Sequence, residues 1–237
     1  MRSSIESDPR PSGPQACCHR WTALQRPIVT LYGLWNRGPE GWLLRHRLSR
    51  LTGNPVNQFH YRTVSAPFED NVAALLRFVE TIPERPIDLV GHSLGGLVAL
   101  AALSSLPPGT VRRVVLLGPP VTGSRAVRNV VSMGKTGRLI VGRNSDVLVA
   151  GFQHAPPPGV EIGVIAGTGG VGVGRLVTRF PGRNDGTVAV DETRLPSATD
   201  HIVLKVTHTG MLFSGEVAHQ TAFFLSGGRF DHPERVG

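Results

Sequence analysis

At 237 residues and 25.4 kDa, the chain has the size of a single domain that buries one large hydrophobic core. Apolar residues make up 40% and charged residues 18% of the sequence, which excludes a chain disordered throughout, and no apolar run approaches the roughly 18 residues of a membrane span. Because its apolar runs are short, we expect no membrane span. The net charge of +8 comes from arginines dispersed along the sequence without interleaved aromatic residues, so we also expect no nucleic-acid partner.

The two ends of the chain differ in composition from its middle. We expect residues 1–20 to form a disordered N-terminal tail, residues 21–228 the folded domain and residues 229–237 a C-terminal tail. The first residues are charged and rich in proline and lack the apolar segment of a secretory signal. The adjacent Cys17 and Cys18 are interpreted as free thiols of a reducing compartment, because a disulfide between neighbours would be strained. We therefore expect a cytoplasmic protein, and the sequence predicts no particular oligomeric state.

Short β-prone segments alternate with segments of helical periodicity in the first half of the chain. The expected strands are residues 28–32, 58–64, 86–90 and 111–117. The expected helices are residues 42–51, 68–82 and 94–106. Consecutive strand–helix units predict an α/β fold whose parallel sheet is covered by helices on both faces.

The second half of the chain has a weaker pattern. Residues 123–152 are interrupted by glycines and predict one or two short helices, which we interpret as a small cap over a site. Further strands are expected at residues 161–166 and 202–206. A closing helix follows, for which Ser214 is the expected N-cap.

The strongest chemical signal is the segment Gly91-His92-Ser93-Leu94-Gly95-Gly96. It lies directly between an expected strand and an expected helix, which is the context of a G-x-S-x-G nucleophile elbow. The sharp turn forces Ser93 into a strained backbone conformation, so the neighbouring side chains must be small. The segment therefore predicts that Ser93 is a nucleophile.

A serine needs a base to become nucleophilic, and the base needs an acid that orients it. His208 follows the last expected strand, at the end where open α/β sheets bind ligands, whereas His201 precedes that strand. We favour His208 as the base. For the acid we favour Asp185, although its Asn-Asp-Gly context is also turn chemistry, over three alternatives: Asp146, Asp191 and Asp200.

Together these segments resemble the α/β-hydrolases, in particular the small bacterial esterase and lipase-like group and, more distantly, the inositol-deacylase-like branch. The resemblance covers residues 26–226 and is carried by four motifs: Tyr32-Gly33-Leu34-Trp35, Gly91 to Gly96, Asn184 to Val188, and Thr207-His208-Thr209-Gly210. It implies an α/β-hydrolase fold with a minimal sheet of about six strands, because the first strands of larger members are missing.

The resemblance implies Ser93 as nucleophile, His208 as general base, Asp185 as its orienting acid, and an oxyanion hole made by the backbone N–H groups of Leu94 and Leu34. Trp35 and His92 are expected to contact the substrate. The predicted function is a serine hydrolase that cleaves small carboxylic esters, with lipid or other acyl esters favoured. Thioesterases and acyltransferases would use the same residues. A non-catalytic module of the same fold that binds a ligand or partner is the alternative.

Two features bear on that alternative and on cofactors. Members of the family usually carry His-Gly where this chain has Tyr32-Gly33, which puts the arrangement of the second oxyanion donor in question. The segment Gly167 to Gly172 matches the G-x-G-x-x-G pattern of dinucleotide sites, but no long helix can follow it, and we interpret it as a flexible loop. No cluster of Cys or His has metal-ligand spacing, so we expect neither a cofactor nor a metal.

Overall fold

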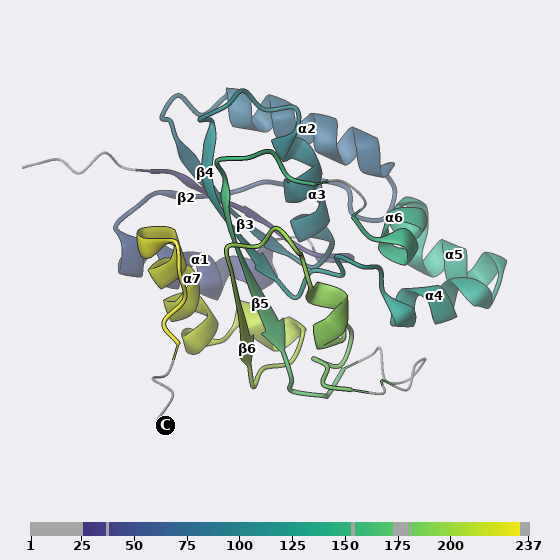
Figure 1. The fold of residues 1–237 in the computed structure, drawn as a ribbon. Helices are drawn as coiled ribbons and strands as arrows, with labels where there is room; N and C mark the ends of the chain where they lie inside the picture. Colours follow the sequence, from purple (N-terminus) through teal and green to yellow (C-terminus); the bar gives the residue numbers. More distant parts are fainter. Residues whose placement is uncertain (1–25, 37, 153–154, 173–179, 181, 233–237) are drawn as a thin grey trace, which may run out of the picture.

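A single parallel sheet organises the molecule. The computed structural model describes residues 26–36, 38–152, 155–172, 180 and 182–232. The strands are β1 (Ile28–Leu31), β2 (Val56–Gln58), β3 (Ile87–His92), β4 (Val111–Leu117), β5 (Glu161–Gly167) and β6 (Asp200–Leu204). They form a six-stranded sheet in the order β2-β1-β3-β4-β5-β6, and every neighbouring pair is parallel (Figure 1). The predicted α/β class, with a parallel sheet of six strands, is confirmed.

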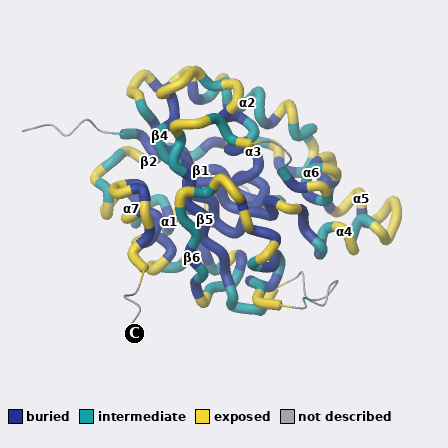
Figure 2. Tube along the Cα trace, viewed as in Figure 1, coloured by how far each residue is buried: buried dark blue, intermediate teal, exposed yellow. Residues whose placement is uncertain are grey.

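Helices cover the two faces of this sheet. The helices α1 (Trp42–Thr52) and α7 (Gly215–Gly227) pack together on one face, and α2 (Phe68–Glu80) and α3 (Leu94–Leu103) pack on the other. Side chains alternate along β4, so Val115 and Leu117 face α1 and α7 while Val114 and Leu116 face α2 and α3. Both faces are therefore apolar, and Figure 2 shows the strands as the buried centre of the molecule.

Two strands, β2 and β6, differ most from their expected ranges. The expected strand at residues 58–64 is wrong, because β2 is an edge strand that pairs only with β1 and β1 ends at Leu31. The chain beyond Gln58 has no strand to pair with and continues as a loop. The last strand runs over Asp200–Leu204 rather than 202–206, since it begins opposite Gly163 of β5.

The segment between β4 and β5 forms three short helices instead of one or two. They are α4 (Arg125–Ser132), α5 (Lys135–Val141) and α6 (Ser145–Ala150), and we call residues 125–150 the helical insertion. The insertion packs on Leu94 and Leu97 of α3 through Val141 and Leu148. It therefore lies beside the start of α3, next to Ser93.

The expected N-terminal tail lies outside the described residues. At the other end, Ser214 accepts a hydrogen bond from the Val217 N–H and caps α7 as expected. Beyond α7, Phe230 is buried and its N–H donates to an Asp200 carboxylate oxygen at 2.8 Å. The packed part of the chain thus extends past residue 228. No helix of the described residues is long and apolar enough to cross a membrane.

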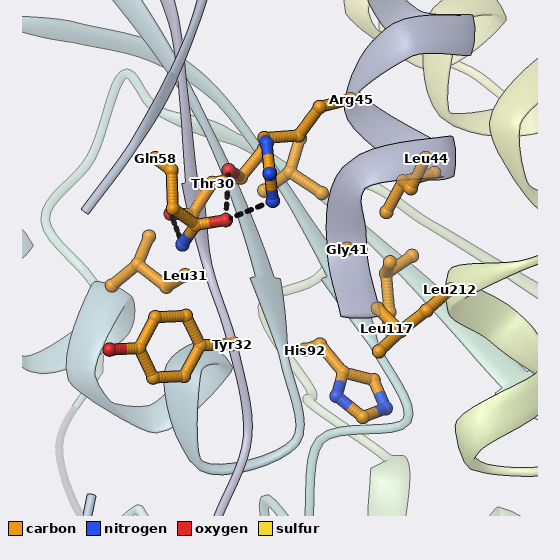
Figure 3. Close-up of a pocket in the computed structure, with 11 residues that line it drawn as sticks. Thr30, Leu31, Tyr32, Gly41, Leu44, Arg45, Gln58, His92, Leu117 and Leu212 are labelled. Atoms are coloured by element: carbon orange, nitrogen blue, oxygen red, sulfur yellow. Dashed lines mark hydrogen bonds between the residues drawn. The ribbon is translucent and has the colours of Figure 1, made fainter. Parts of the chain in front are cut away.

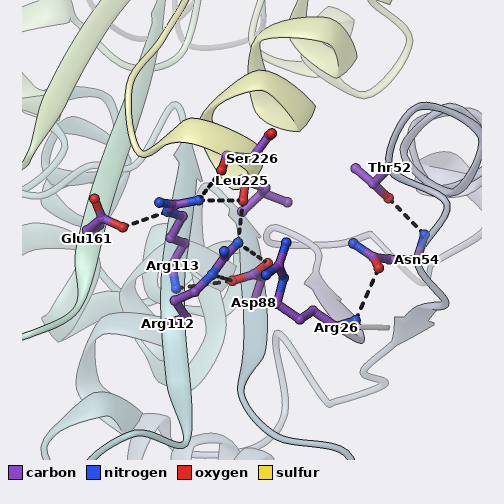
Figure 4. Close-up of polar contacts among 9 residues, drawn as sticks. All are labelled: Arg26, Thr52, Asn54, Asp88, Arg112, Arg113, Glu161, Leu225 and Ser226. Carbon is purple, nitrogen blue, oxygen red and sulfur yellow. Dashed lines mark hydrogen bonds and ion pairs between the residues drawn. The ribbon is translucent and has the colours of Figure 1, made fainter. Parts of the chain in front are cut away.

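The amino ends of the central strands carry an ion-pair network (Figure 4). Asp88 of β3 is buried and accepts hydrogen bonds from the Arg112 guanidinium and the Arg113 N–H of β4. Arg113 also pairs with Glu161 of β5 at 2.6 Å and donates to the last carbonyls of α7, at Leu225 and Ser226. The network joins three strands to the negative end of the α7 dipole, at the sheet edge opposite to the site described next.

Candidate active site

The turn between β3 and α3 presents Ser93. Its φ of 55° and ψ of −121° lie outside the regions that most residues occupy, so the turn is a strained elbow. A Cβ atom at Gly91 would lie 2.6 Å from the Gly96 Cα, and one at Gly95 would lie 2.7 Å from the Leu31 carbonyl oxygen. Glycine is required at both positions because the strand and helix approach so closely. The elbow geometry therefore has the form that the motif predicts.

Asp185 and His208 form a buried pair on two neighbouring loops. The Asp185 Oδ2 atom lies 2.6 Å from the His208 Nδ1 atom, and its Oδ1 atom accepts the backbone N–H groups of Thr187 and Val188 at 2.9 and 2.7 Å. The backbone N–H of His208 also donates to the backbone carbonyl of Asp185 at 2.9 Å. Because a carboxylate only accepts hydrogen bonds, Nδ1 carries the proton of the neutral imidazole, and in that form Nε2 keeps its lone pair. The pair therefore holds His208 in the tautomer that can accept a proton at Nε2.

The end of β4 links this pair to Ser93. The Ser93 N–H donates to the Leu117 carbonyl at 2.9 Å, and the next residue, Gly118, abuts the pair. A Cβ atom at Gly118 would lie 3.1 Å from both the Asp185 Oδ2 and the His208 Nδ1. Ser93 and the Asp185–His208 pair therefore lie at the same carboxyl edge of the sheet. Within the described residues, the Ser93 Oγ atom makes no hydrogen bond.

The glycine-rich segment that begins at Gly167, the last residue of β5, allows these loops to pack. A Cβ atom at Gly167 would lie 2.5 Å from the Val206 carbonyl oxygen and 2.7 Å from the Asp185 Cβ. The described part of this segment therefore has a structural reason for its glycines: it lies against both the loop that carries Asp185 and the loop that carries His208.

His92 lies beside the pair with only 4% of its surface exposed. Its Nε2–H donates to the His208 carbonyl at 3.0 Å, and the two imidazole rings are 4.7 Å apart. Burial, and then the nearby His208, lower the pKa of His92 to about 3, so its ring is neutral. The Nδ1 atom has no hydrogen-bond partner within the described residues and faces Gly33. His92 therefore supports the backbone of His208 through this hydrogen bond. Although we expected His92 to contact the substrate, its side chain has almost no exposed surface.

The loop after β1 lies against Ser93 and His92 through Gly33. The Tyr32 side chain lies against Tyr61: its hydroxyl donates to the Tyr61 carbonyl and accepts the Tyr61 N–H, both at 2.9 Å, and the two rings stack at 4.9 Å. Trp35 has a φ of 64° and is 54% exposed. Its N–H donates to the Thr63 hydroxyl at 3.1 Å, and its indole N–H donates to the Ile140 carbonyl of α5 at 3.0 Å. The loop that carries Leu34 is thus anchored on both sides.

Tyr61 and Thr63 are supporting residues that the sequence analysis missed. Both lie in the segment expected to be a strand, where alternate side chains would have faced opposite sides of a sheet. No local signal could have placed them, because the end of β2 depends on where β1 ends in the sheet.

Two cavities lie near these elements, and neither is lined by Ser93 or His208. A cavity of about 20 Å³ beside His92 is also bordered by Thr30, Gln58 and Arg45, whose polar atoms are linked by hydrogen bonds (Figure 3). A groove of about 680 Å³ runs between α2, α3 and α6. The first is too small for an acyl chain. Within the described residues, no group of three or more His, Cys, Asp or Glu side chains could hold a metal ion.

The parallel sheet, the strained serine elbow and the Asp–His pair are features of one class of proteins, and comparison with known families agrees. The model of the alpha/beta hydrolase family matches residues 20–218, so the chain belongs to this family. Lipase LipV of Mycobacterium tuberculosis is 36% identical over 110 residues, which span 44% of this chain and 41% of that lipase.

Solved structures extend the likeness in fold. The mature lipase BlEst2 of Bacillus licheniformis superposes with a TM-score of 0.69 at 20% identity, over 86% of this chain and 92% of the lipase. A metagenomic carboxyl esterase superposes with a TM-score of 0.56 at 16% identity, over 79% of this chain and 65% of the esterase. The chain is thus an α/β hydrolase with distant similarity to lipases and esterases.

Proposed function

We propose that this chain is a serine hydrolase that cleaves carboxylic esters through an acyl-enzyme intermediate, with Ser93, His208 and Asp185 as its catalytic triad. The observation that carries the proposal is the buried hydrogen bond of 2.6 Å between Asp185 and His208, at the same sheet edge as the strained Ser93. A module that only binds a ligand needs neither the strain at Ser93 nor the oriented imidazole.

In this mechanism, the Ser93 Oγ atom attacks the ester carbonyl carbon while its proton passes to the His208 Nε2 atom. Asp185 holds the imidazole in the required tautomer and stabilises its protonated form. The protonated His208 then gives its proton to the leaving alcohol. Water repeats the sequence on the acyl-enzyme, which releases the acid and restores Ser93.

The negative charge on the carbonyl oxygen requires donors at the elbow. We assign this role to the backbone N–H groups of Leu94, at the start of α3, and Leu34, in the loop after β1. Tyr32, which replaces the usual histidine, supports this loop through Tyr61, and a donor made by the backbone does not require a particular side chain at this position. The similarity to lipases favours acyl or lipid esters as substrates.

The test is the hydrolysis of p-nitrophenyl esters of increasing chain length by the wild type and by Ser93→Ala. We expect activity in the wild type and a loss of at least about 1,000-fold in kcat in the variant. Ser104→Ala, at the far end of α3, is the matched control and should retain full activity. A Ser93→Ala variant as active as the wild type would refute the proposal.

A further inference from the structure

The hairpin formed by α4 and α5 leaves apolar side chains uncovered. It projects from the body of the molecule, and its outer turns are exposed (Figures 1 and 2). Met133, in the turn between the two helices, is 62% exposed, while Leu139 and Ile140 of α5 are 80% and 41% exposed. Trp35 continues this patch, because its indole N–H bonds to the Ile140 carbonyl. We call Trp35, Met133, Leu139 and Ile140 the apolar tip.

Helix geometry places a cation on the same outer face. Gly137 and Val141 are buried, so they mark the inner side of α5. Residues two positions apart in a helix are about 200° apart around its axis, so Leu139 lies opposite Gly137. Lys135 precedes Leu139 by four residues and lies on that same side. The outer face of α5 therefore combines an ammonium group with an exposed leucine.

The charge of the whole insertion has one sign. Residues 125–150 contain five basic side chains and one acidic side chain, and therefore hold half of the net charge of +8. Arg125 pairs with Asp191, and Arg138 pairs with Asp146. The remaining three are exposed and have no acidic partner within the described residues: Arg128, Lys135 and Arg143.

We propose that the α4–α5 hairpin docks on the surface of an anionic phospholipid membrane, with the apolar tip inserted at the headgroup level and the three unpaired cations facing lipid phosphates. Uncovered apolar side chains flanked by unpaired basic ones are the pattern of a segment that lies in a membrane interface. Because Trp35 belongs to the loop beside Ser93, docking would turn the active-site edge toward the lipid. This goes beyond the proposed ester hydrolysis, since binding requires no catalytic residue.

The experiment is cosedimentation of the full chain with vesicles of phosphatidylcholine alone or of phosphatidylcholine mixed with phosphatidylglycerol. We expect binding to the anionic vesicles that weakens as salt is added. Leu139→Ser should weaken it by about tenfold or more. Lys135→Gln and Arg128→Gln should each weaken it by about fivefold. Leu51→Ser, which changes an exposed leucine of α1, is the matched control and should bind as the wild type does.

The outcomes separate docking from catalysis. Ser93→Ala should bind vesicles normally while failing to hydrolyse a soluble ester, so either claim can fail alone. Equal binding to both vesicle types, no binding, or variants of the hairpin that bind like the wild type would overturn docking. So would a Leu139-dependent dimer in light scattering, which makes a second copy the occupant, or retention on heparin without vesicle binding.

Discussion

Protonation of His92 should couple stability to pH. Its pKa falls from 6.5 to about 3 in the folded protein, because the ring is buried and lies beside His208. Between these two values the unfolded chain binds the proton and the folded chain does not, so the free energy of unfolding increases with pH across this window. His92 therefore makes acid destabilising by up to about 1.4 kcal/mol for each pH unit below 6.5. At about pH 4.5 the loss amounts to about 3 kcal/mol.

The test compares the wild type with His92→Gln in urea unfolding, followed by circular dichroism from about pH 7 to about pH 4.5. The glutamine Nε2 atom lies near the position of the imidazole Nε2 atom and keeps the donor to the His208 carbonyl, but it does not titrate. The difference in unfolding free energy between the two proteins should shift in favour of His92→Gln by about 1.4 kcal/mol per pH unit as the pH falls. A difference that stays constant with pH would refute the reasoning.

Three further substitutions test other parts of the structure. Gly33→Ala places a Cβ atom 3.0 Å from the Ser93 Cβ and 3.1 Å from the His92 Nδ1, so the loop after β1 must shift. We expect kcat for a p-nitrophenyl ester to fall about 100-fold, and an unchanged kcat would show that the position of this loop is not critical. Asp185→Asn keeps an acceptor for the backbone N–H groups of its turn but places an amide N–H₂ group against His208. We expect kcat to fall about 10,000-fold while the stability in urea changes little, and a near-normal kcat would exclude Asp185 as the orienting acid. Asp88→Ala removes the buried partner of Arg112 at the opposite sheet edge. We expect the free energy of unfolding, measured in urea, to fall by about 3 kcal/mol while kcat is preserved, and an unchanged stability would contradict the importance of that network.

The sequence predicts the fold well where two physical signals coincide. Five of the seven residues at 111–117 are apolar, the segment is bordered by turns, and it forms a strand with the expected bounds. The elbow is equally clear, because glycines flank Ser93 between a strand and a helix. Such local patterns determine both the element and the position of Ser93 in the turn.

Features that depend on distant partners are harder to predict. The length of β2 depends on where β1 ends, and the run of β-prone residues after Gln58 gives no sign of that limit. His92 directly precedes Ser93 in the sequence, which suggests contact with a substrate, yet its side chain is held by a hydrogen bond to the carbonyl of His208, 116 positions later in the chain. The support of Trp35 by Thr63 and Ile140 likewise appears only when the loop and the insertion come together.

The most direct measurement of an activated Ser93 is labelling of the purified protein with a fluorophosphonate probe, followed by peptide mapping of the adduct. This reaction requires the serine, its base and the oxyanion donors but no particular substrate. We predict modification of Ser93 in the wild type and in Ser104→Ala, and none in Ser93→Ala or His208→Ala. A correctly folded wild type that stays unlabelled, or that is labelled at another residue, would contradict the assignment of this chain as a serine hydrolase.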